Sequence, residues 1–308
     1  MNGKYLSALT RYLVFGLGAV SLVSMRSQPG LLAEPINQDH SPVRTSGCAV
    51  NGSRTGLLTQ TTTDGNHTQR TYLLQIPDSY SQKRVYPLVF VFHGARGTAT
   101  QSHSWGLQDA KGASGNAIFV FPQGIMFRNE QVGWDDSPRG YDMVLFDNIL
   151  HDVESNYCVD PSEVFVAGFS WGADFATSLA CDRGDKIRAI AVNSTNDEFR
   201  DKMDYQTYRY LPCRSKPFPA VRFEHAIDGD GPYPAPYFET TSKLFQSLDS
   251  CKATSKPVPS PASVTSCVAY DGCKKELVEC SFDKSLGHRL PPGWAQGAWD
   301  FFKSFQQP

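Results

Sequence analysis

Residues Gly168-Phe169-Ser170-Trp171-Gly172 have the pattern G-x-S-x-G, which can present a serine as a nucleophile. An apolar run at 164–167 precedes the pattern and an alanine-rich stretch at 173–181 follows it, as a strand and a helix would. A sharp turn from strand into helix strains the serine backbone and lifts its hydroxyl clear of the sheet. The pattern therefore predicts catalysis by Ser170. The alternative is a glycine-bounded surface turn whose serine caps a helix.

A serine hydroxyl is a poor nucleophile until a base takes its proton, and an acid must orient that base. In α/β-hydrolases the chain order is Ser, then Asp or Glu, then His. Only His225 and His288 of the seven histidines follow Ser170. His225 ends an expected strand at 220–224 and leaves little chain for an acid before it. His288 follows another expected strand, at 277–282, so we predict that His288 is the base.

The acid is expected in the loop at 226–233, after the strand that precedes the one leading to His288. This loop offers two carboxylates, Asp228 and Asp230. Aspartate beside glycine also favours ordinary turns, so one of the two could be a turn residue and the other catalytic.

An acyl-transfer site also needs backbone N–H donors for the oxyanion of the tetrahedral intermediate. One donor is expected from Trp171, the residue after the nucleophile. The other should come from the loop at 93–97, after the expected strand at 88–92, and we assign it to Ala95. His93 in the same loop precedes Ser170 and breaks the expected chain order, which favours a structural role.

Strand-like apolar runs and helix-like segments alternate along the chain. Several of the runs are continuous rather than alternating, which is typical of parallel strands covered on both faces. Helices are expected at 142–155, where Asp142 could be the N-cap, at 238–248 and at 294–305. The alternation predicts a single α/β domain at 48–308 with a mostly parallel, doubly wound sheet.

The N-terminus predicts export. Lys4 and Arg11 precede a 14-residue apolar run at 12–25, which is shorter than the roughly 20 residues that span a bilayer. We predict a secretory signal at 1–26 and a polar leader at 27–47, with an uncleaved anchor as the alternative. The net charge of -2 and pI of ≈ 6.4 give no indication of a nucleic-acid partner.

Eight cysteines, an even number in an exported chain, predict four disulfides. A zinc site is the rival interpretation, but the C-terminal cysteines lack close C-x-x-C spacing and paired histidines. Cys267 and Cys280 flank an expected hairpin and could pair across it, and Cys181 could pair with Cys213. Cys251–Cys273 and Cys48–Cys158 then follow by elimination. Three sequons for N-glycosylation begin at Asn51, Asn66 and Asn193.

From 48 to 305 the chain resembles the secreted feruloyl esterases of carbohydrate esterase family one, and it shares much with polyhydroxybutyrate depolymerase-like esterases. The resemblance is carried by motifs at 92–94, 118–124, 133–134, 157–160, 168–172, 180–181 and 287–288. It implies an α/β-hydrolase with a Ser-Asp-His triad and no cofactor. The implied partner is a hydroxycinnamoyl ester of plant cell-wall polysaccharide, without nucleic acid or stable membrane association.

Two departures from the family pattern concern the acid loop and the acyl pocket. The family places its acid four residues before a proline, and counting back from Pro232 selects Asp228 over Asp230. After the serine turn the family continues with glycine, whereas this chain has Ala173-Asp174, an extra carboxylate near the acyl pocket. We therefore predict a secreted serine esterase with Ser170, Asp228 and His288. The alternatives are an acetyl xylan esterase, a polyester depolymerase and a catalytically dead binding module.

Overall fold

The computed structural model describes residues 43–127, 131–195, 213, 218–229, 235–260 and 266–306. The chain divides into two units, Met1–His40 and Ser41–Pro308, and all described residues belong to the second. The predicted signal at 1–26 and most of the predicted leader thus lie outside the described residues. Within the described ranges, no helix has the length and apolar character needed to cross a bilayer.

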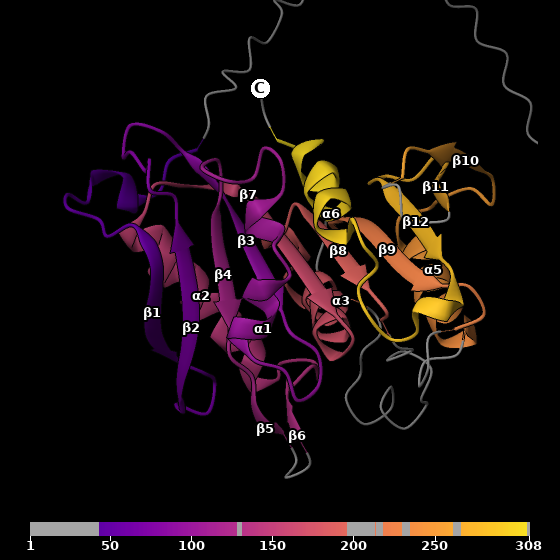
Figure 1. The fold of residues 1–308 in the computed structure, drawn as a ribbon, viewed down its shortest axis with the longest axis horizontal. Helices are drawn as coiled ribbons and strands as arrows, with labels where there is room; N and C mark the ends of the chain where they lie inside the picture. Colours follow the sequence, from indigo (N-terminus) through magenta and orange to yellow (C-terminus); the bar gives the residue numbers. More distant parts are fainter. Residues whose placement is uncertain are drawn as a thin grey trace, which may run out of the picture. The chain divides into compact units, whose positions relative to one another are not determined.

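A ten-stranded sheet forms the centre of the described domain, in the order β1-β2-β4-β3-β7-β8-β9-β12-β11-β10 (Figure 1). The strands from β4 to β12 in this order run parallel, and antiparallel strands flank them on both sides. The strands of the sheet are β1 Gly56–Thr63, β2 Gln69–Ile76, β3 Tyr86–Phe92, β4 Ile118–Pro122, β7 Val159–Phe169, β8 Ala189–Asn193, β9 Ala220–Ala226, β10 Ser255–Val258, β11 Ser266–Tyr270 and β12 Leu277–Phe282. A separate hairpin joins β5 Ile125–Phe127 and β6 Gln131–Gly133.

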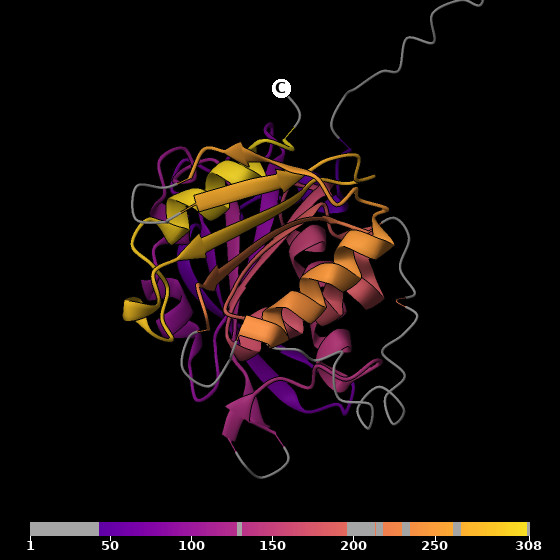
Figure 2. The ribbon, with the colours of Figure 1, turned by 90° about the vertical axis from the view of Figure 1, so that its right-hand side faces the viewer.

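Helices cover both faces of the sheet (Figure 2). One core packs beneath α2 Tyr141–Asn156, α3 Trp171–Arg183 and α5 Ala235–Leu248, and the other beneath α1 Ala99–Ser104 and α6 Trp294–Lys303. Short 3-10 helices are η1 Ser46–Ala49, η2 Leu107–Asp109, η3 Gly184–Lys186 and η4 Lys284–Leu286. Because both faces are covered, β3 is apolar throughout and every one of its residues is buried. The predicted doubly wound α/β architecture is confirmed.

Asp142 does not have the capping role predicted for it. Helix α2 begins at Tyr141 with Gly140 as its N-cap, and Asp142 lies in the first turn. Its buried carboxylate instead forms an ion pair with Arg70 of β2. A second ion pair joins Arg70 Nη1 to Asp64 Oδ2 over 2.9 Å. This buried cluster connects the turn between β1 and β2 to the start of α2.

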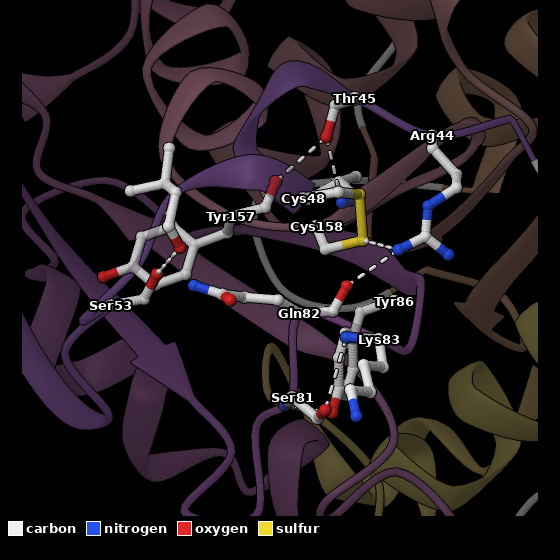
Figure 3. The surroundings of a disulfide bond; sticks show 12 residues. Arg44, Thr45, Cys48, Ser53, Ser81, Gln82, Lys83, Tyr86, Tyr157 and Cys158 are labelled. Carbon is white, nitrogen blue, oxygen red and sulfur yellow. Dashed lines mark hydrogen bonds between the residues drawn. A yellow bond between two sulfur atoms is a disulfide. The ribbon is translucent and has the colours of Figure 1, made fainter.

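All four predicted disulfides are present: Cys48–Cys158, Cys181–Cys213, Cys251–Cys273 and Cys267–Cys280. No cysteine of the chain is free. Figure 3 shows that chain preceding Cys48 also packs on the domain. The hydroxyl of Thr45 donates to the carbonyl of Tyr157 over 2.9 Å and accepts from the N–H of Val159 over 3.1 Å. Residues 43–47, the described end of the stretch predicted as a leader, are thus part of the folded domain.

Candidate active site

Ser170 lies in the sharp turn between β7 and α3, with φ 54° and ψ −128°. A positive φ is costly for a residue with a side chain, and such strain persists only where the surroundings enforce it. The N–H of Ser170 donates to the carbonyl of Asn193 over 3.0 Å, and its carbonyl accepts from Ala173 and Asp174. These bonds fix the backbone at the turn, and Ser170 itself is only 4% exposed.

Glycine is required on both sides of Ser170 because backbone segments pass very close. A Cβ at Gly168 would lie 2.2 Å from the carbonyl oxygen of Gly172. A Cβ at Gly172 would lie 2.2 Å from the carbonyl oxygen of Phe92, at the end of β3. The two glycines therefore let α3 start directly against the strand beside β7. This is the physical reason for the G-x-S-x-G pattern in this chain.

His288 meets Ser170 across 118 residues of sequence. Its Nε2 lies 2.8 Å from Ser170 Oγ, within hydrogen-bonding distance. The imidazole follows β12 and η4, and its ring packs against Phe169 with centroids 4.8 Å apart. Phe169 directly precedes Ser170, so the nucleophile turn itself helps to hold the imidazole. The structure thus brings together two of the predicted catalytic residues in the geometry of a nucleophile and its base.

The loop predicted to hold the oxyanion lies beside the nucleophile. A Cβ on Gly94 would be only 3.1 Å from the Cβ of Ser170. Ala95 comes next, and its N–H donates none of the hydrogen bonds formed among the described residues. Trp171 is the first residue of α3, and the first N–H groups of a helix have no acceptor within that helix. Both predicted donors are therefore near Ser170. Trp171 follows it along the backbone, and Ala95 belongs to the loop that packs against the turn.

His93 has a structural role, as predicted. It is fully buried, and its Nδ1 donates to the carbonyl of Gly94 over 2.8 Å. Its Nε2 accepts from the N–H of Gly124 over 2.9 Å. Burial lowers the pKa of His93 to about 4, so the ring is neutral and each nitrogen has one defined partner. The ring ties the end of β3 to the loop before β5.

The structure does not bring Asp228 to His288. The Asp228 side chain is 72% exposed, and its carboxylate lies 3.6 Å from Lys284 Nζ. The residue has φ 61° and belongs to a turn in which Gly229 donates to the carbonyl of Ala226. These are the features of a solvated turn residue. Asp230, the other candidate acid, lies outside the described residues.

Trp171 has a side-chain partner that the sequence did not indicate. Its indole Nε1 donates to Asp136 Oδ2 over 2.8 Å. The benzo ring lies so close to β6 that a Cβ on Gly133 would be 2.4 Å from the ring atoms Cε3 and Cζ3. Asp136 lies two residues after Trp134, at the end of the Gly133-Trp134 motif that carries part of the family resemblance. This position in the sequence was the one indication that Asp136 could lie near the active site. The indole is thus fixed between β6 and a carboxylate, one residue from the nucleophile.

Trp105, Trp134, Trp171 and Trp294 could each shape a pocket for an aromatic acyl group, and they differ in their surroundings. Trp134 and Trp294 are 0% and 2% exposed and belong to the two cores. Trp105 and Trp171 are only partly buried. Trp105 packs edge-on against Phe169, with ring centroids 5.9 Å apart. Two aromatic side chains near the nucleophile therefore have surface left for a ligand.

Asp174, the additional carboxylate of this chain, is buried one helical turn after Ser170. It is 3% exposed, and its Oδ1 accepts from the hydroxyl of Thr195 over 3.0 Å. Thr195 follows β8, the strand that holds the backbone of Ser170. Asp174 therefore ties the nucleophile helix to the end of β8. No group of three His, Cys, Asp or Glu side chains in the described ranges is arranged to hold a metal ion.

A parallel sheet with the nucleophile turn after β7 and the base after β12 defines an α/β-hydrolase fold with a serine–histidine pair. The chain is 32% identical over 247 residues to feruloyl esterase C of Emericella nidulans, a match covering 76% of this chain and 83% of that protein. The chain belongs to this feruloyl esterase family. No family model matches the chain.

Other relatives match over shorter stretches. Feruloyl esterase D of Neurospora crassa is 36% identical over 145 residues, covering 43% of this chain and 48% of that protein. The probable feruloyl esterase C of Aspergillus niger is 38% identical over 132 residues, covering 41% of this chain and 46% of that protein. In these two alignments the chain spans about half the length of each relative.

Solved structures share the fold. An acetyl xylan esterase from Aspergillus awamori superimposes with a TM-score of 0.59 at 16% identity, covering 80% of this chain and 99% of that one. A ferulic acid esterase superimposes with a TM-score of 0.54 at 17% identity, covering 81% of this chain and 96% of that one. At these identities the likeness establishes the α/β-hydrolase fold, and it confirms the predicted fold class.

Proposed function

We propose that the protein is a secreted serine esterase that hydrolyses feruloyl and related hydroxycinnamoyl esters of plant cell-wall polysaccharide. The observation that carries the proposal is the 2.8 Å separation of His288 Nε2 and Ser170 Oγ at a strained strand-to-helix turn. Membership of the feruloyl esterase family supports the acyl group. The partly exposed aromatic side chains of Trp105 and Trp171 supply surface on which a flat aryl group could stack.

The reaction follows from the positions of the proton carriers. As Ser170 Oγ attacks the ester carbonyl carbon, His288 Nε2 accepts the hydroxyl proton. The carbonyl oxygen becomes an oxyanion, and the backbone N–H groups of Trp171 and Ala95 stabilise it. His288 then gives its proton to the leaving alcohol as the carbon–oxygen bond breaks. A water molecule repeats the sequence on the acyl-enzyme, releasing the carboxylic acid and restoring Ser170.

The third member of the triad is one of the two aspartates in the loop after β9. The exposure of Asp228 and its ion pair with Lys284 favour Asp230 for this role. An acid that orients a catalytic imidazole is normally shielded from solvent and hydrogen-bonded to it. We therefore propose Asp230 as the triad acid, in place of the Asp228 that the family spacing selects.

Secretion is part of the same proposal. Four disulfides are typical of chains that fold in an oxidising compartment, and they support a signal at 1–26 that is removed on export. Sequencing the N-terminus of the mature protein tests the signal.

The activity is tested with methyl ferulate, acetylated xylan, hydroxybutyrate oligomers and a nitrophenyl ester. Ser170→Ala is the control, and it should lower turnover by roughly a million-fold. Methyl ferulate is expected to be the best substrate. Preference for acetylated xylan or the oligomers would assign another substrate class to the same site. Failure to hydrolyse even the nitrophenyl ester would indicate a binding module.

A further inference from the structure

The three glycosylation sequons lie in very different surroundings. Asn66 lies in the turn between β1 and β2, where all residues from 65 to 69 are exposed. Asn51 is exposed in a bend after η1. Asn193 is 0% exposed, at the end of β8, where its carbonyl accepts from the N–H of Ser170. Two of the three asparagines can therefore carry a sugar in the folded protein, and Asn193 cannot.

A cavity of about 490 Å³ opens beside Asn51, and nothing in the proposed reaction uses it. Its volume falls within the range of roughly 300–1,000 Å³ that small-molecule sites span. The cavity lies beside β1, β2 and the end of α2, close to where β7 begins. The nucleophile follows the other end of β7, so the cavity is separate from the active site. Figure 3 shows two of its lining residues, Ser53 and Tyr157, near the Cys48–Cys158 disulfide.

The lining of this cavity combines amide, carboxylate and aromatic groups, which suit a sugar that has both hydroxyls and an apolar ring face. Gln60, Asp152 and Asn156 supply hydrogen-bonding groups. Tyr157 is 6% exposed, and its hydroxyl is already engaged with the carbonyl of Arg54 over 3.2 Å. Tyr157 and Leu74 both line the cavity and supply the apolar part of its wall.

We propose that Asn51 and Asn66 are N-glycosylated, and that the first sugars of the Asn51 glycan pack into this cavity. In the modification, the side-chain amide nitrogen of asparagine bonds to C1 of an N-acetylglucosamine carried by a polyprenyl pyrophosphate. The bond from C1 to the phosphate oxygen breaks, the pyrophosphate lipid leaves, and the amide loses a proton. The proposal rests on the secretion in the proposed function, and it does not depend on the esterase activity.

The glycans of the two asparagines are expected to behave differently because Asn51 lines this cavity and Asn66 does not. The amide of Asn66 lies at a hairpin tip and makes no side-chain hydrogen bond among the described residues. Its glycan should extend into solvent and stay accessible to enzymes. The Asn51 glycan should gain contacts with the fold and stabilise it.

The test uses the full chain secreted from a yeast, with glycopeptides mapped by mass spectrometry after enzymatic release in water labelled with heavy oxygen, which is retained in the new carboxylate. Peptides containing Asn51 and Asn66 should show the deamidation mark, and the Asn193 peptide should show none. On the native protein, peptide N-glycosidase should remove the Asn66 glycan at least tenfold faster than the Asn51 glycan, and unfolding should abolish this difference. Asn51→Gln should lower the Tm by a few degrees, and the matched Asn66→Gln should leave it unchanged.

An unmodified Asn51, or a modified Asn193, would overturn the assignment of sites. Equal release rates for the two glycans on the native protein would overturn the packing in the cavity. The same chain behind the host's own secretion signal serves as a second sample. Glycans that appear only with the host's signal would show that the predicted signal at 1–26 does not direct secretion, while the glycosylation sites themselves are correct. Ester hydrolysis is measured on the same samples, so a failed esterase proposal is seen independently.

Discussion

The indole N–H of Trp171 donates to Asp136 over 2.8 Å, and this bond fixes the side chain that directly follows the nucleophile. The backbone N–H of Trp171 is the proposed oxyanion donor. A bond at the end of its side chain therefore helps to hold the residue that carries this donor. Asp136 follows Asp135, whose N–H donates to the buried carboxylate of Asp142 over 2.7 Å. A chain of contacts therefore connects the Arg70 cluster to the wall of the active site.

Removing the Asp136 carboxylate should loosen the Trp171 side chain beside the nucleophile. We expect Asp136→Ala to lower kcat/KM about tenfold, the loss typical of a hydrogen bond to a charged group. Asp136→Asn keeps an acceptor oxygen at the same place and should lose less. Steady-state kinetics on a nitrophenyl ester check the effect, and urea unfolding shows whether stability is retained. Wild-type kinetics for both variants would mean that the indole position is irrelevant to catalysis.

The two aspartates of the acid loop should differ sharply. An amide in place of the triad acid favours the wrong imidazole tautomer and costs about ten-thousand-fold in turnover. We expect this loss for Asp230→Asn. Asp228→Asn removes only an exposed ion pair with Lys284, so turnover should stay within about tenfold of wild type. Turnover numbers for the two variants decide the assignment. The reverse ranking would return the role to Asp228, and two mild effects would place the acid elsewhere.

The sequence predicted features that depend on short-range geometry. The glycines around Ser170 are required by backbone approach distances, and chain order then selected His288, which the structure brings to the serine. The strands also followed from local patterns, whereas Cys251–Cys273 and Cys48–Cys158 followed only by elimination once the other two pairs were assigned. Asp228 was selected by counting residues to a proline, and a count gives no information about the direction of a side chain. The bond between Asp136 and Trp171 joins separate elements and depends on how α3 packs beside β6.

The buried ion pairs of Arg70 should matter far more for stability than an ion pair at the surface. Arg70 contacts Asp64 and Asp142, and the three side chains are fully buried. Arg70→Met leaves two buried carboxylates without their cation, which typically costs about 3–5 kcal/mol of unfolding free energy. The matched control is Arg183→Met, which breaks a partly exposed pair with Asp147 and should cost at most about 1 kcal/mol. Urea unfolding of the secreted protein measures both, and similar losses would contradict this ranking.

Glu224 should make stability fall as the pH rises toward neutrality. Burial raises its pKa from 4.5 to about 7, although Arg222 lies 3.6 Å away and opposes the shift. Neither carboxylate oxygen makes a hydrogen bond with another described residue. Because the folded state binds the proton more tightly than the unfolded state, the stabilisation is complete below about pH 4.5 and is lost as the pH passes 7. Glu224→Gln, which cannot ionise, should flatten this part of the profile of Tm against pH. A variant profile as steep as that of the wild type would show that another group titrates there.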